Sequence, residues 1–259
     1  MEREQAIKFM RDLLKLMIEK GGSDLFITVG FPPAMKINGK MTPVSKTELS
    51  PENVRALVYA VMNDKQLKEY EATKECNFAV APSGIGRFRA NAFIQQSFCG
   101  LVMRVIETEV PNLEKLGLPE VLKDVVMSKN GLVIMVGGTG SGKSTSLAAM
   151  LDHRNANTHG HIITIEDPIE YVHPHKNCII MQREVGVDCD DWEIALKNTL
   201  RQAPDVILLG EIRDKETMEF GIAFAETGHL AMATLHANSS NQALDRIINF
   251  FSEERKAQL

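Results

Sequence analysis

The sequence predicts an α/β fold, in which a small α+β domain precedes a larger domain with a mainly parallel sheet. Between residues 24 and 106, short alternating segments separated by turns are typical of an antiparallel sheet. From residue 131 onward, short apolar runs mostly alternate with helical stretches, which is the pattern of a parallel sheet covered on both faces. Between these parts, residues 107–119 contain two prolines and few strand signals, so we expect an interdomain connector there.

The first expected element is an amphipathic helix over residues 5–20. Ile7, Met10, Leu14 and Met17 share one face at helical spacing, and charged residues occupy the opposite face. Because the charged face carries acids as well as bases, we expect the helix to pack on its own domain rather than on a membrane surface.

The rest of the N-terminal domain combines a hairpin, a helix and three further strands. Asn38-Gly39 is suited to a type I′ turn between two short extended segments of residues 24–44. Ser50-Pro51-Glu52 provides an N-cap, a proline at the first helical position and an early acid, which predicts a helix that runs to about Met62. The three strands, at residues 76–81, 87–95 and 100–106, are expected to form an antiparallel meander.

Three arginines stand out in this meander. Arg87 and Arg89 share one strand face, while Arg104 lies inside an apolar strand. Two interpretations of Arg104 remain open. It extends to solvent or pairs with a local acid, as strand arginines do, or it forms an anion clamp that is aimed at another subunit.

A glycine-rich stretch opens the second domain. Residues 137–145 follow the apolar run of residues 132–136 and precede a helical stretch. Backbone N–H groups of such a turn and the helix N-terminus form an anion cradle, so the stretch predicts a phosphate-binding loop. We expect Lys143 to reach the outer phosphates and the Ser144 hydroxyl to ligate Mg²⁺, which makes ATP and Mg²⁺ the expected cofactors. The predicted nucleotide-binding residues are Gly138, Thr139, Gly140, Ser141, Gly142, Lys143, Ser144 and Thr145.

Acidic residues and a histidine follow several strands of the predicted parallel sheet. In such sheets, ligands bind beyond the carboxyl ends of the strands. Glu211 is expected to hold Mg²⁺ through water, and His236 to contact the γ-phosphate. Which of Glu166, Asp167 and Glu170 acts on the attacking water stays open. The five strands are predicted at residues 131–136, 161–165, 178–181, 206–210 and 230–235.

Other polar residues are interpreted as structural. Asp214 is expected to cap a helix that runs to Thr227, and Asp190-Asp191 to cap a helix that begins at Trp192. Two histidine pairs have spacings that occur in metal sites, but each lacks a third ligand of obvious geometry. We assign these residues to loops: His159, His161, His173 and His175.

The composition excludes several classes of protein. The net charge of −5 provides no general basic field, and no local basic stripe is present, so we expect no nucleic-acid partner. No apolar run approaches the length needed to cross a bilayer, so we expect a cytoplasmic protein without direct membrane insertion. The cysteines lack paired spacing, which argues against a zinc knot and a disulfide framework. We expect reduced, buried thiols at Cys76, Cys99, Cys178 and Cys189.

Four segments in order resemble the Walker A, Asp, Walker B and His boxes of secretion-type hexameric ATPases. The resemblance covers essentially the whole chain and is strongest to the type IV pilus retraction ATPases, especially to the paralogue of the main retraction motor. It implies a PAS-like domain at residues 1–107, a linker at 108–119 and a RecA-like ATPase domain at 120–259. The four segments are residues 138–145 (GTGSGKST), 165–170 (IEDPIE), 200–214 (LRQAPDVILLGEIRD) and 225–238 (AETGHLAMATLHAN).

The resemblance also implies roles for individual residues. Glu170 is the implied catalytic base, Glu211 the Walker B acid, and His229 and His236 the histidines of the His box. Three arginines are implied to approach the nucleotide at a subunit boundary of a homo-hexamer, whose domain rotation during the ATP cycle drives pilus retraction. These arginines are Arg87, Arg89 and Arg104.

The implied setting is the cytoplasmic face of the inner-membrane pilus machine. The implied partners are an inner-membrane platform protein and a paralogous retraction ATPase. Two departures from the family pattern are visible. The family continues into a C-terminal helical region, whereas this chain ends at Leu259 in a predicted polar helix that begins near Ser252. Gly138 stands where proline is common, and glycine can take the same backbone path.

Two alternative functions remain open. The chain fits an accessory ring subunit that binds ATP, has low turnover and acts with a partner motor. It also resembles pilus extension and type II secretion ATPases in the four boxes. Those relatives usually carry a longer N-terminal region and a tetracysteine element, neither of which is visible in this sequence.

Overall fold

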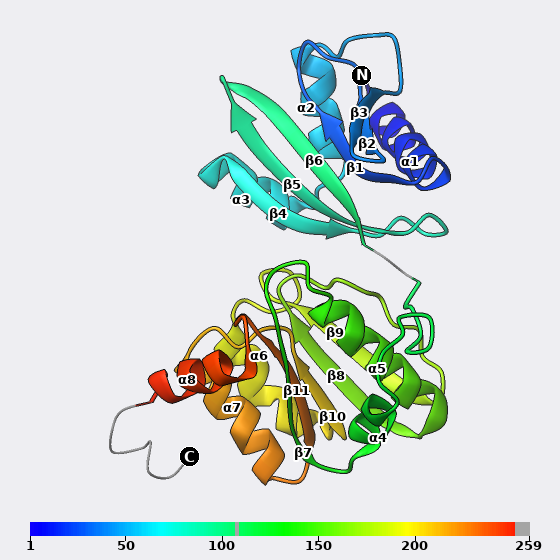
Figure 1. The fold of residues 1–259 in the computed structure, drawn as a ribbon. Helices are drawn as coiled ribbons and strands as arrows, with labels where there is room; N and C mark the ends of the chain where they lie inside the picture. Colours follow the sequence, from blue (N-terminus) through cyan, green and yellow to red (C-terminus); the bar gives the residue numbers. More distant parts are fainter. Residues whose placement is uncertain (107–108, 252–259) are drawn as a thin grey trace. The chain divides into compact units, whose positions relative to one another are not determined.

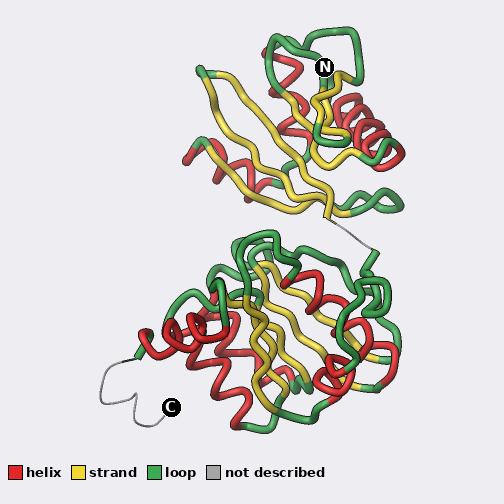
Figure 2. The backbone as a smooth tube through the Cα atoms, in the orientation of Figure 1, coloured by secondary structure: helices red, strands yellow, loops and turns green. Residues whose placement is uncertain are grey.

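A computed structural model describes residues 1–106 and 109–251 of the chain. The chain divides into two compact units, Met1–Ile106 and Glu107–Leu259 (Figure 1). The polar helix expected near Ser252 lies outside the described residues. Figure 2 shows strands in both units, with helices packed beside them. The α/β fold that the sequence predicts is therefore confirmed.

The first unit is built on a six-stranded sheet in which every pair of neighbours is antiparallel. Its strand order is β3-β2-β1-β6-β5-β4. The strands are β1 (Gly22–Ile27), β2 (Ala34–Ile37), β3 (Lys40–Pro43), β4 (Glu75–Val80), β5 (Arg87–Gln95) and β6 (Phe98–Ile106), and the helices are α1 (Arg3–Glu19), α2 (Pro51–Ala60) and α3 (Asp64–Thr73).

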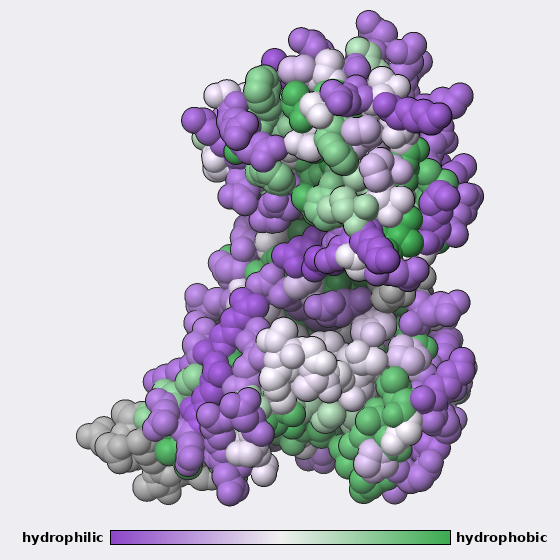
Figure 3. Space-filling view, turned by 45° about the horizontal axis from the view of Figure 1, so that its top comes forward, coloured by the Kyte–Doolittle hydropathy of each residue, from purple (hydrophilic) through white to green (hydrophobic). Residues whose placement is uncertain are grey.

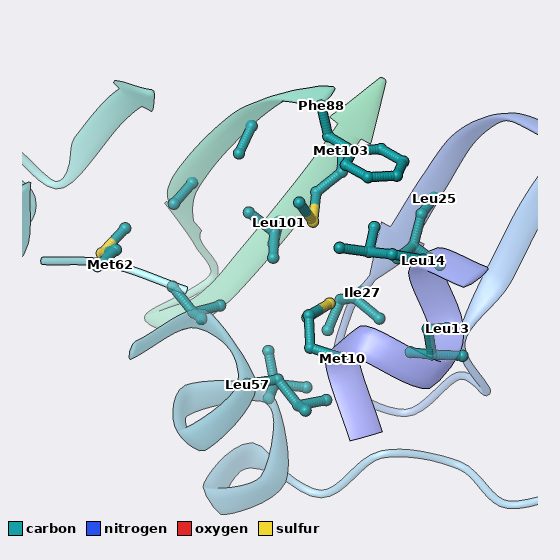
Figure 4. Packing of buried hydrophobic residues seen from close by; sticks show 14 of the residues in the cluster. Met10, Leu13, Leu14, Leu25, Ile27, Leu57, Met62, Phe88, Leu101 and Met103 are labelled. Atoms are coloured by element: carbon teal, nitrogen blue, oxygen red, sulfur yellow. The ribbon is translucent and has the colours of Figure 1, made fainter. Parts of the chain in front are cut away.

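One core holds the first unit together. Met10 of α1 and Leu57 of α2 meet Leu25, Leu101 and Met103 of the sheet, and all five side chains are fully buried (Figure 4). The alternation of buried and half-buried residues along β5 puts one face of the sheet against the helices. Burial of this apolar face supplies most of the driving force for folding the unit.

Two local predictions for the first unit are confirmed. Asn38 and Gly39 have φ values of 49° and 77° and join β2 to β3, as a type I′ turn requires. The backbone N–H of Asn53 donates a hydrogen bond to Ser50 Oγ at 3.3 Å, so Ser50 caps α2.

Helices α1 and α3 depart from the predicted pattern. Helix α1 packs on its own unit as expected, but Ile7 is 39% exposed, and Ala6 and Leu13 complete the buried face instead. Met10, Leu14 and Met17 are buried as predicted, so the prediction was wrong for Ile7 alone. The sequence analysis did not predict α3, which begins with a capping box between Asn63 and Gln66.

The second unit contains a five-stranded sheet whose neighbouring strands are all parallel, in the order β7-β11-β10-β8-β9. This confirms the predicted parallel sheet. The strands are β7 (Gly131–Val136), β8 (Gly160–Glu166), β9 (Cys178–Glu184), β10 (Val206–Leu209) and β11 (Leu230–Leu235).

Helices cover both faces of this sheet (Figure 1). Ile162 of β8 faces one buried cluster together with residues of α5, while its neighbour Ile163 faces the other with residues of α6 and α7. Both faces are apolar, which explains why the strands appear as unbroken apolar runs in the sequence. The helices are α4 (Val121–Met127), α5 (Lys143–Asn157), α6 (Trp192–Thr199), the short 3₁₀ helix η1 (Leu200–Gln202), α7 (Lys215–Glu226) and α8 (Ser240–Asn249).

Two helix caps in the second unit were predicted correctly. Asp191 accepts a hydrogen bond from the Ile194 N–H at 2.7 Å at the start of α6. Asp214 accepts one from the Thr217 N–H at 2.9 Å at the start of α7. Both carboxylates also lie favourably at the positive end of a helix dipole.

The segment before α4 and the end of α4 are tied to the second unit. Leu113, within the segment expected to be a connector, is buried in the same cluster as α5 residues. The buried Arg154 of α5 donates hydrogen bonds from Nη1 to the carbonyl oxygens of Val126 and Ser128, at 2.6 and 2.8 Å. Its cation thereby binds carbonyl groups at the C-terminus of α4, where positive charge is favourable.

Strand β9 forms one edge of the parallel sheet. Two of its backbone donors are bound by side chains. The Ile180 N–H donates to His175 Nδ1 at 3.1 Å, and the Glu184 N–H donates to Asp188 Oδ2 at 2.9 Å. These contacts satisfy backbone groups that have no neighbouring strand.

On the face that Figure 3 shows, hydrophilic residues cover much of each unit. The helices of the described residues are too short or too polar to span a bilayer. All four cysteines are free thiols. Cys99 is only half-buried, which corrects the prediction for that residue, whereas the other three are buried.

Candidate functional site

The loop between β7 and α5 has the geometry of a phosphate cradle. It leaves the sheet at Gly137, and α5 begins at Lys143. Gly140 and Gly142 have φ values of 76° and 90°, a region that favours glycine. A β-carbon on Gly137 would collide with Ser141 Oγ. The loop conformation therefore favours glycine at positions 140 and 142, and the Ser141 side chain leaves little room for a β-carbon at Gly137.

Lys143 lies folded into this loop. Its Nζ donates hydrogen bonds to the carbonyl oxygens of Gly137 and Gly138, both at 2.9 Å, and the residue is 9% exposed. The ammonium group is thus held beside the anion cradle by contacts that a phosphate oxygen can replace.

A cavity of about 210 Å³ lies at the carboxyl ends of the strands, next to the loop. It brings together Lys143, Ser144, Glu170, Glu211 and His236, which the sequence predicts as site residues. These come from four different segments, so the topology of the sheet gathers them. The lining residues are Thr139, Gly140, Lys143, Ser144, Glu166, Asp167, Pro168, Glu170, Gly210, Glu211, Thr234 and His236.

Glu211 is contacted on both carboxylate oxygens. Arg213 Nε lies 2.8 Å from Oε2, and His236 Nε2 lies 3.4 Å from Oε1. Arg213 also pairs through Nη1 with Asp167 Oδ2 at 3.0 Å. The hydrogen bond to Glu211 and the nearby Asp167 charge raise the pKa of Arg213. One guanidinium therefore bridges the loops that follow β10 and β8.

The three acids at the end of β8 and in the loop that follows have different environments. Glu166 is buried and accepts hydrogen bonds on Oε1 from Thr164 Oγ1 at 2.6 Å and Gln182 Nε2 at 3.3 Å. Burial raises the pKa of Glu166 to about 7. Asp167 is paired with Arg213. Glu170 is exposed and lines the cavity.

Gln182 of β9 anchors the segment that carries these acids. Its amide nitrogen also donates to the Tyr171 carbonyl at 2.8 Å, and its amide oxygen accepts from the His173 N–H at 2.8 Å. The Tyr171 hydroxyl lies 3.1 Å from Thr145 Oγ1 on α5. His173 is buried, and desolvation lowers its pKa to about 4, so its imidazole is neutral.

His229 does not line the cavity. It precedes β11, whereas His236 follows that strand, so the two lie at opposite ends of β11. The His229 ring lies 3.1 Å from Thr227 Oγ1 through Nδ1. His229 and His236 come from one sequence box, but the length of a strand separates them.

The three arginines predicted as site residues lie in the first unit. Arg87 and Arg89 are half-buried on β5. Arg104 of β6 pairs through Nε with the buried Asp24 of β1, at 2.7 Å, although its own side chain is 71% exposed. This is the local pairing that one of the two interpretations of Arg104 expects.

One of the four histidines that the sequence analysis assigns to loops lies in a strand. His161 lies within β8 rather than in a loop, which corrects that assignment. Among the described residues, no group of three or more His, Cys, Asp or Glu side chains suits a metal ion.

The sequence analysis did not predict Arg213 and Gln182 as site residues. The only available signal was the position of Arg213, two residues after Glu211.

The residues at the loop fit a nucleotide with Mg²⁺. The Ser144 hydroxyl and the Glu211 carboxylate are oxygen donors, the ligand type that Mg²⁺ prefers. Mg²⁺ commonly takes only one or two protein ligands and fills its shell with phosphate oxygens and waters. Because the described residues contain no group of three or more His, Cys, Asp or Glu side chains that could hold a metal by itself, the site suits a metal that phosphate oxygens also ligate.

Comparison with known proteins gives consistent matches. A family model described as "Type II/IV secretion system protein" matches residues 2–258. The chain is 62% identical over 247 residues to the type IV pilus ATPase PilU of Pseudomonas aeruginosa, across 95% of this chain and 65% of PilU. It is 44% identical to PilT of the same organism, across 96% of this chain and 72% of PilT. The chain thus spans less than two thirds of the length of PilU.

A solved structure has the same arrangement of elements. The crystal structure of the pilus retraction motor PilT with bound ADP matches this chain with a TM-score of 0.90 and 42% sequence identity. The match covers 95% of this chain and 72% of the PilT chain.

Proposed function

Because the chain belongs to the family of type II/IV secretion system proteins, we propose that it forms the ATP-binding and ATP-hydrolysing part of a type IV pilus retraction ATPase. The membership confirms the resemblance that the four sequence boxes indicate. The observation that carries the proposal is the cavity that brings Lys143, Ser144, Glu170, Glu211 and His236 together beside the phosphate loop.

Binding of ATP uses the loop and the start of α5. The backbone N–H groups and the dipole of α5 favour the phosphates, and Lys143 leaves its two carbonyl partners to pair with them. Ser144 and Glu211 would hold Mg²⁺, the latter through water, and the metal would supply charge neutralisation at the phosphate oxygens. The solved PilT structure contains bound ADP, which supports a nucleotide as the ligand of this chain.

Hydrolysis needs a group that orients the attacking water and accepts its proton. Glu170 fits this role better than its two neighbours because it is exposed on the cavity. Glu166 is buried and accepts hydrogen bonds from Thr164 and Gln182, and Asp167 forms an ion pair with Arg213. His236, at the end of β11, is the candidate contact of the γ-phosphate.

The wider assembly follows from the same proposal. We infer a homo-hexamer in which the N-terminal domain is PAS-like, the second domain is RecA-like, and Arg87, Arg89 and Arg104 approach the nucleotide of a neighbouring subunit. The exposed guanidinium of Arg104 supports this role, since its pairing with Asp24 leaves most of the side chain accessible. The inferred partners are the inner-membrane platform protein and a paralogous retraction ATPase, at the cytoplasmic face of the inner membrane.

The test is steady-state ATP hydrolysis by the purified chain, together with binding of a fluorescent ATP analogue. Lys143→Ala is expected to abolish binding and turnover, and Glu170→Gln to retain binding while turnover falls roughly 100-fold or more, as for loss of a general base. The exposed residues Lys197 and Glu193 of α6 provide matched controls, Lys197→Ala and Glu193→Gln, with unchanged rates.

The outcomes separate the alternatives. Lys143-dependent binding without turnover would favour an accessory ring subunit. Turnover that neither Lys143→Ala nor Glu170→Gln changes would exclude the proposed site.

A further inference from the structure

We propose that Arg213 is a positioning residue, which holds the loop carrying Glu170 in register with Glu211 by joining Asp167 to Glu211. The inference rests on the proposed function, because it takes Glu170 as the group that orients the attacking water. Arg213 itself is not placed on the nucleotide. It acts through the two carboxylates that it contacts.

The geometry shows one side chain spanning two loops. Arg213 uses Nε for Glu211, at 2.8 Å, and Nη1 for Asp167, at 3.0 Å. Asp167 and Glu211 are 44 positions apart in the sequence and follow different strands, β8 and β10, which are neighbours in the sheet. The planar guanidinium presents its donors at fixed angles, so it sets the separation of the two carboxylates as well as their charge balance.

Glu170 lies three residues beyond Asp167, so its position depends on how this loop is fixed. The loop has a second set of anchors on the side of β9. Gln182 binds the Tyr171 carbonyl at 2.8 Å, and the Ile169 N–H donates to Glu184 Oε2 at 3.2 Å. The β9 contacts hold the far end of the loop, and Arg213 provides the contact that relates it to Glu211.

The charges of Asp167 and Glu211 also support a positioning role for Arg213. Without Arg213, the carboxylates of Asp167 and Glu211 would face one cavity as two like charges, and repulsion would move them apart. His236 contacts only the other oxygen of Glu211. Arg213 forms ion pairs with both carboxylates and so compensates the repulsion between them.

Stabilisation of the fold does not account for this arrangement. The side chains of Arg213, Asp167 and Glu211 are 47%, 31% and 23% exposed, and ion pairs at such exposure add little to folding stability. Placement of reacting groups is more sensitive, since a displacement of about 1 Å can reduce a rate roughly 100-fold. The bridge that Arg213 forms between Asp167 and Glu211 is thus expected to affect ATP turnover far more than the free energy of unfolding.

The experiment compares Arg213→Ala, Asp167→Asn and the double variant in ATP hydrolysis. Each single change is expected to lower kcat roughly 10- to 100-fold while KM for ATP changes less than about threefold. The double variant should be no slower than the slower single variant, because both remove the same bridge. Arg213→Lys should recover part of kcat, since an ammonium can satisfy only one carboxylate well.

A second readout does not require turnover. Amide hydrogen exchange of residues 166–171, measured without nucleotide, should become faster in Arg213→Ala and Asp167→Asn, including at the Ile169 N–H. Lys176→Ala is the matched control. It breaks a 2.7 Å ion pair with Asp152 outside the lining of the cavity, so neither kcat nor exchange in residues 166–171 should change.

Any of three results would contradict the proposed role of Arg213. The kcat losses of the two single variants could multiply in the double variant, or KM could rise while kcat stays unchanged. Amide exchange in residues 166–171 could also stay at the wild-type rate. If the wild-type chain shows no Lys143-dependent turnover, the proposed function fails, and the exchange measurement alone decides whether Arg213 fixes the loop.

Discussion

The backbone of Gly210 lies directly against that of Glu166. A β-carbon built on Gly210 would lie 3.0 Å from Glu166 Cα and 3.2 Å from the Ile165 carbonyl oxygen. Gly210 comes immediately before Glu211, so this close approach sets how near the ends of β8 and β10 can be. The prediction is that Gly210→Ala forces the two ends apart, lowers ATP turnover, and destabilises the second unit by about 1–3 kcal/mol, as overpacking does.

Gly221 provides the control for this substitution. It lies in α7, and a β-carbon there would be 3.6 Å from Leu132 Cδ1, an ordinary contact. Gly221→Ala should leave turnover unchanged and stabilise the unit by about 0.5–1 kcal/mol through helix propensity. Equal effects of the two substitutions in urea denaturation would contradict the close approach at Gly210.

The pH dependence of stability should reveal two opposing buried groups. The pKa of Glu166 rises from 4.5 to about 7 on folding, so this group lowers stability as pH rises through that range. The pKa of His173 falls from 6.5 to about 4, so this group raises stability as pH rises from about 4 to 6.5. In the wild type, the two slopes partly cancel.

Single substitutions should expose each slope. Glu166→Gln should make the free energy of unfolding increase more steeply as pH rises from 4.5 to 6.5. His173→Gln should make the free energy of unfolding fall as pH rises over the same range. The single tryptophan of the chain, Trp192, lies on α6 and reports on the second unit, so fluorescence during urea denaturation at several pH values measures the effect. Parallel pH profiles for both variants and the wild type would argue against buried titration.

Arg154 should be a stability residue without a role in nucleotide binding. Arg154→Ala leaves the carbonyls of Val126 and Ser128 without their charged donor, at a cost of about 2–3 kcal/mol. Urea denaturation monitored at Trp192 measures this loss, and Arg201→Ala on the exposed surface of η1 is the control. A change in ATP affinity larger than the change in stability would count against the interpretation.

Mixed assemblies test the proposed role of Arg104. Arg104→Ala subunits keep an intact phosphate loop, and Lys143→Ala subunits keep Arg104. A boundary between the two kinds of subunit can therefore contain one complete pocket. We expect each variant alone to be inactive and mixtures to recover part of the ATP hydrolysis rate. If no mixing ratio restores activity, Arg104 acts within its own unit, through its pairing with Asp24.

Much of the fold is predictable because the sequence patterns are local. The strands of the second unit are short apolar runs with both faces buried. The cap residues Ser50, Asp191 and Asp214 each accept a hydrogen bond from the backbone N–H three residues later in the chain. Errors arise where burial depends on the partner surface. Ile7 fits the helical spacing, but the tertiary packing of α1 turns it outward.

The site is predictable only in part. The phosphate loop and the acids at the strand ends follow from spacing and from the topology of a parallel sheet. The pairing of Arg213 with Asp167, and of Gln182 with the loop after β8, joins residues 46 and 11 positions apart. Such contacts depend on the order of strands in the sheet, which spacing along the chain does not encode.

The bound donors on the outer side of β9 also affect how the protein behaves at high concentration. An unprotected edge strand offers a template on which a foreign strand can extend the sheet. Here an incoming chain would first have to displace His175 from Ile180 and Asp188 from Glu184. This margin of the sheet therefore resists edge-to-edge aggregation.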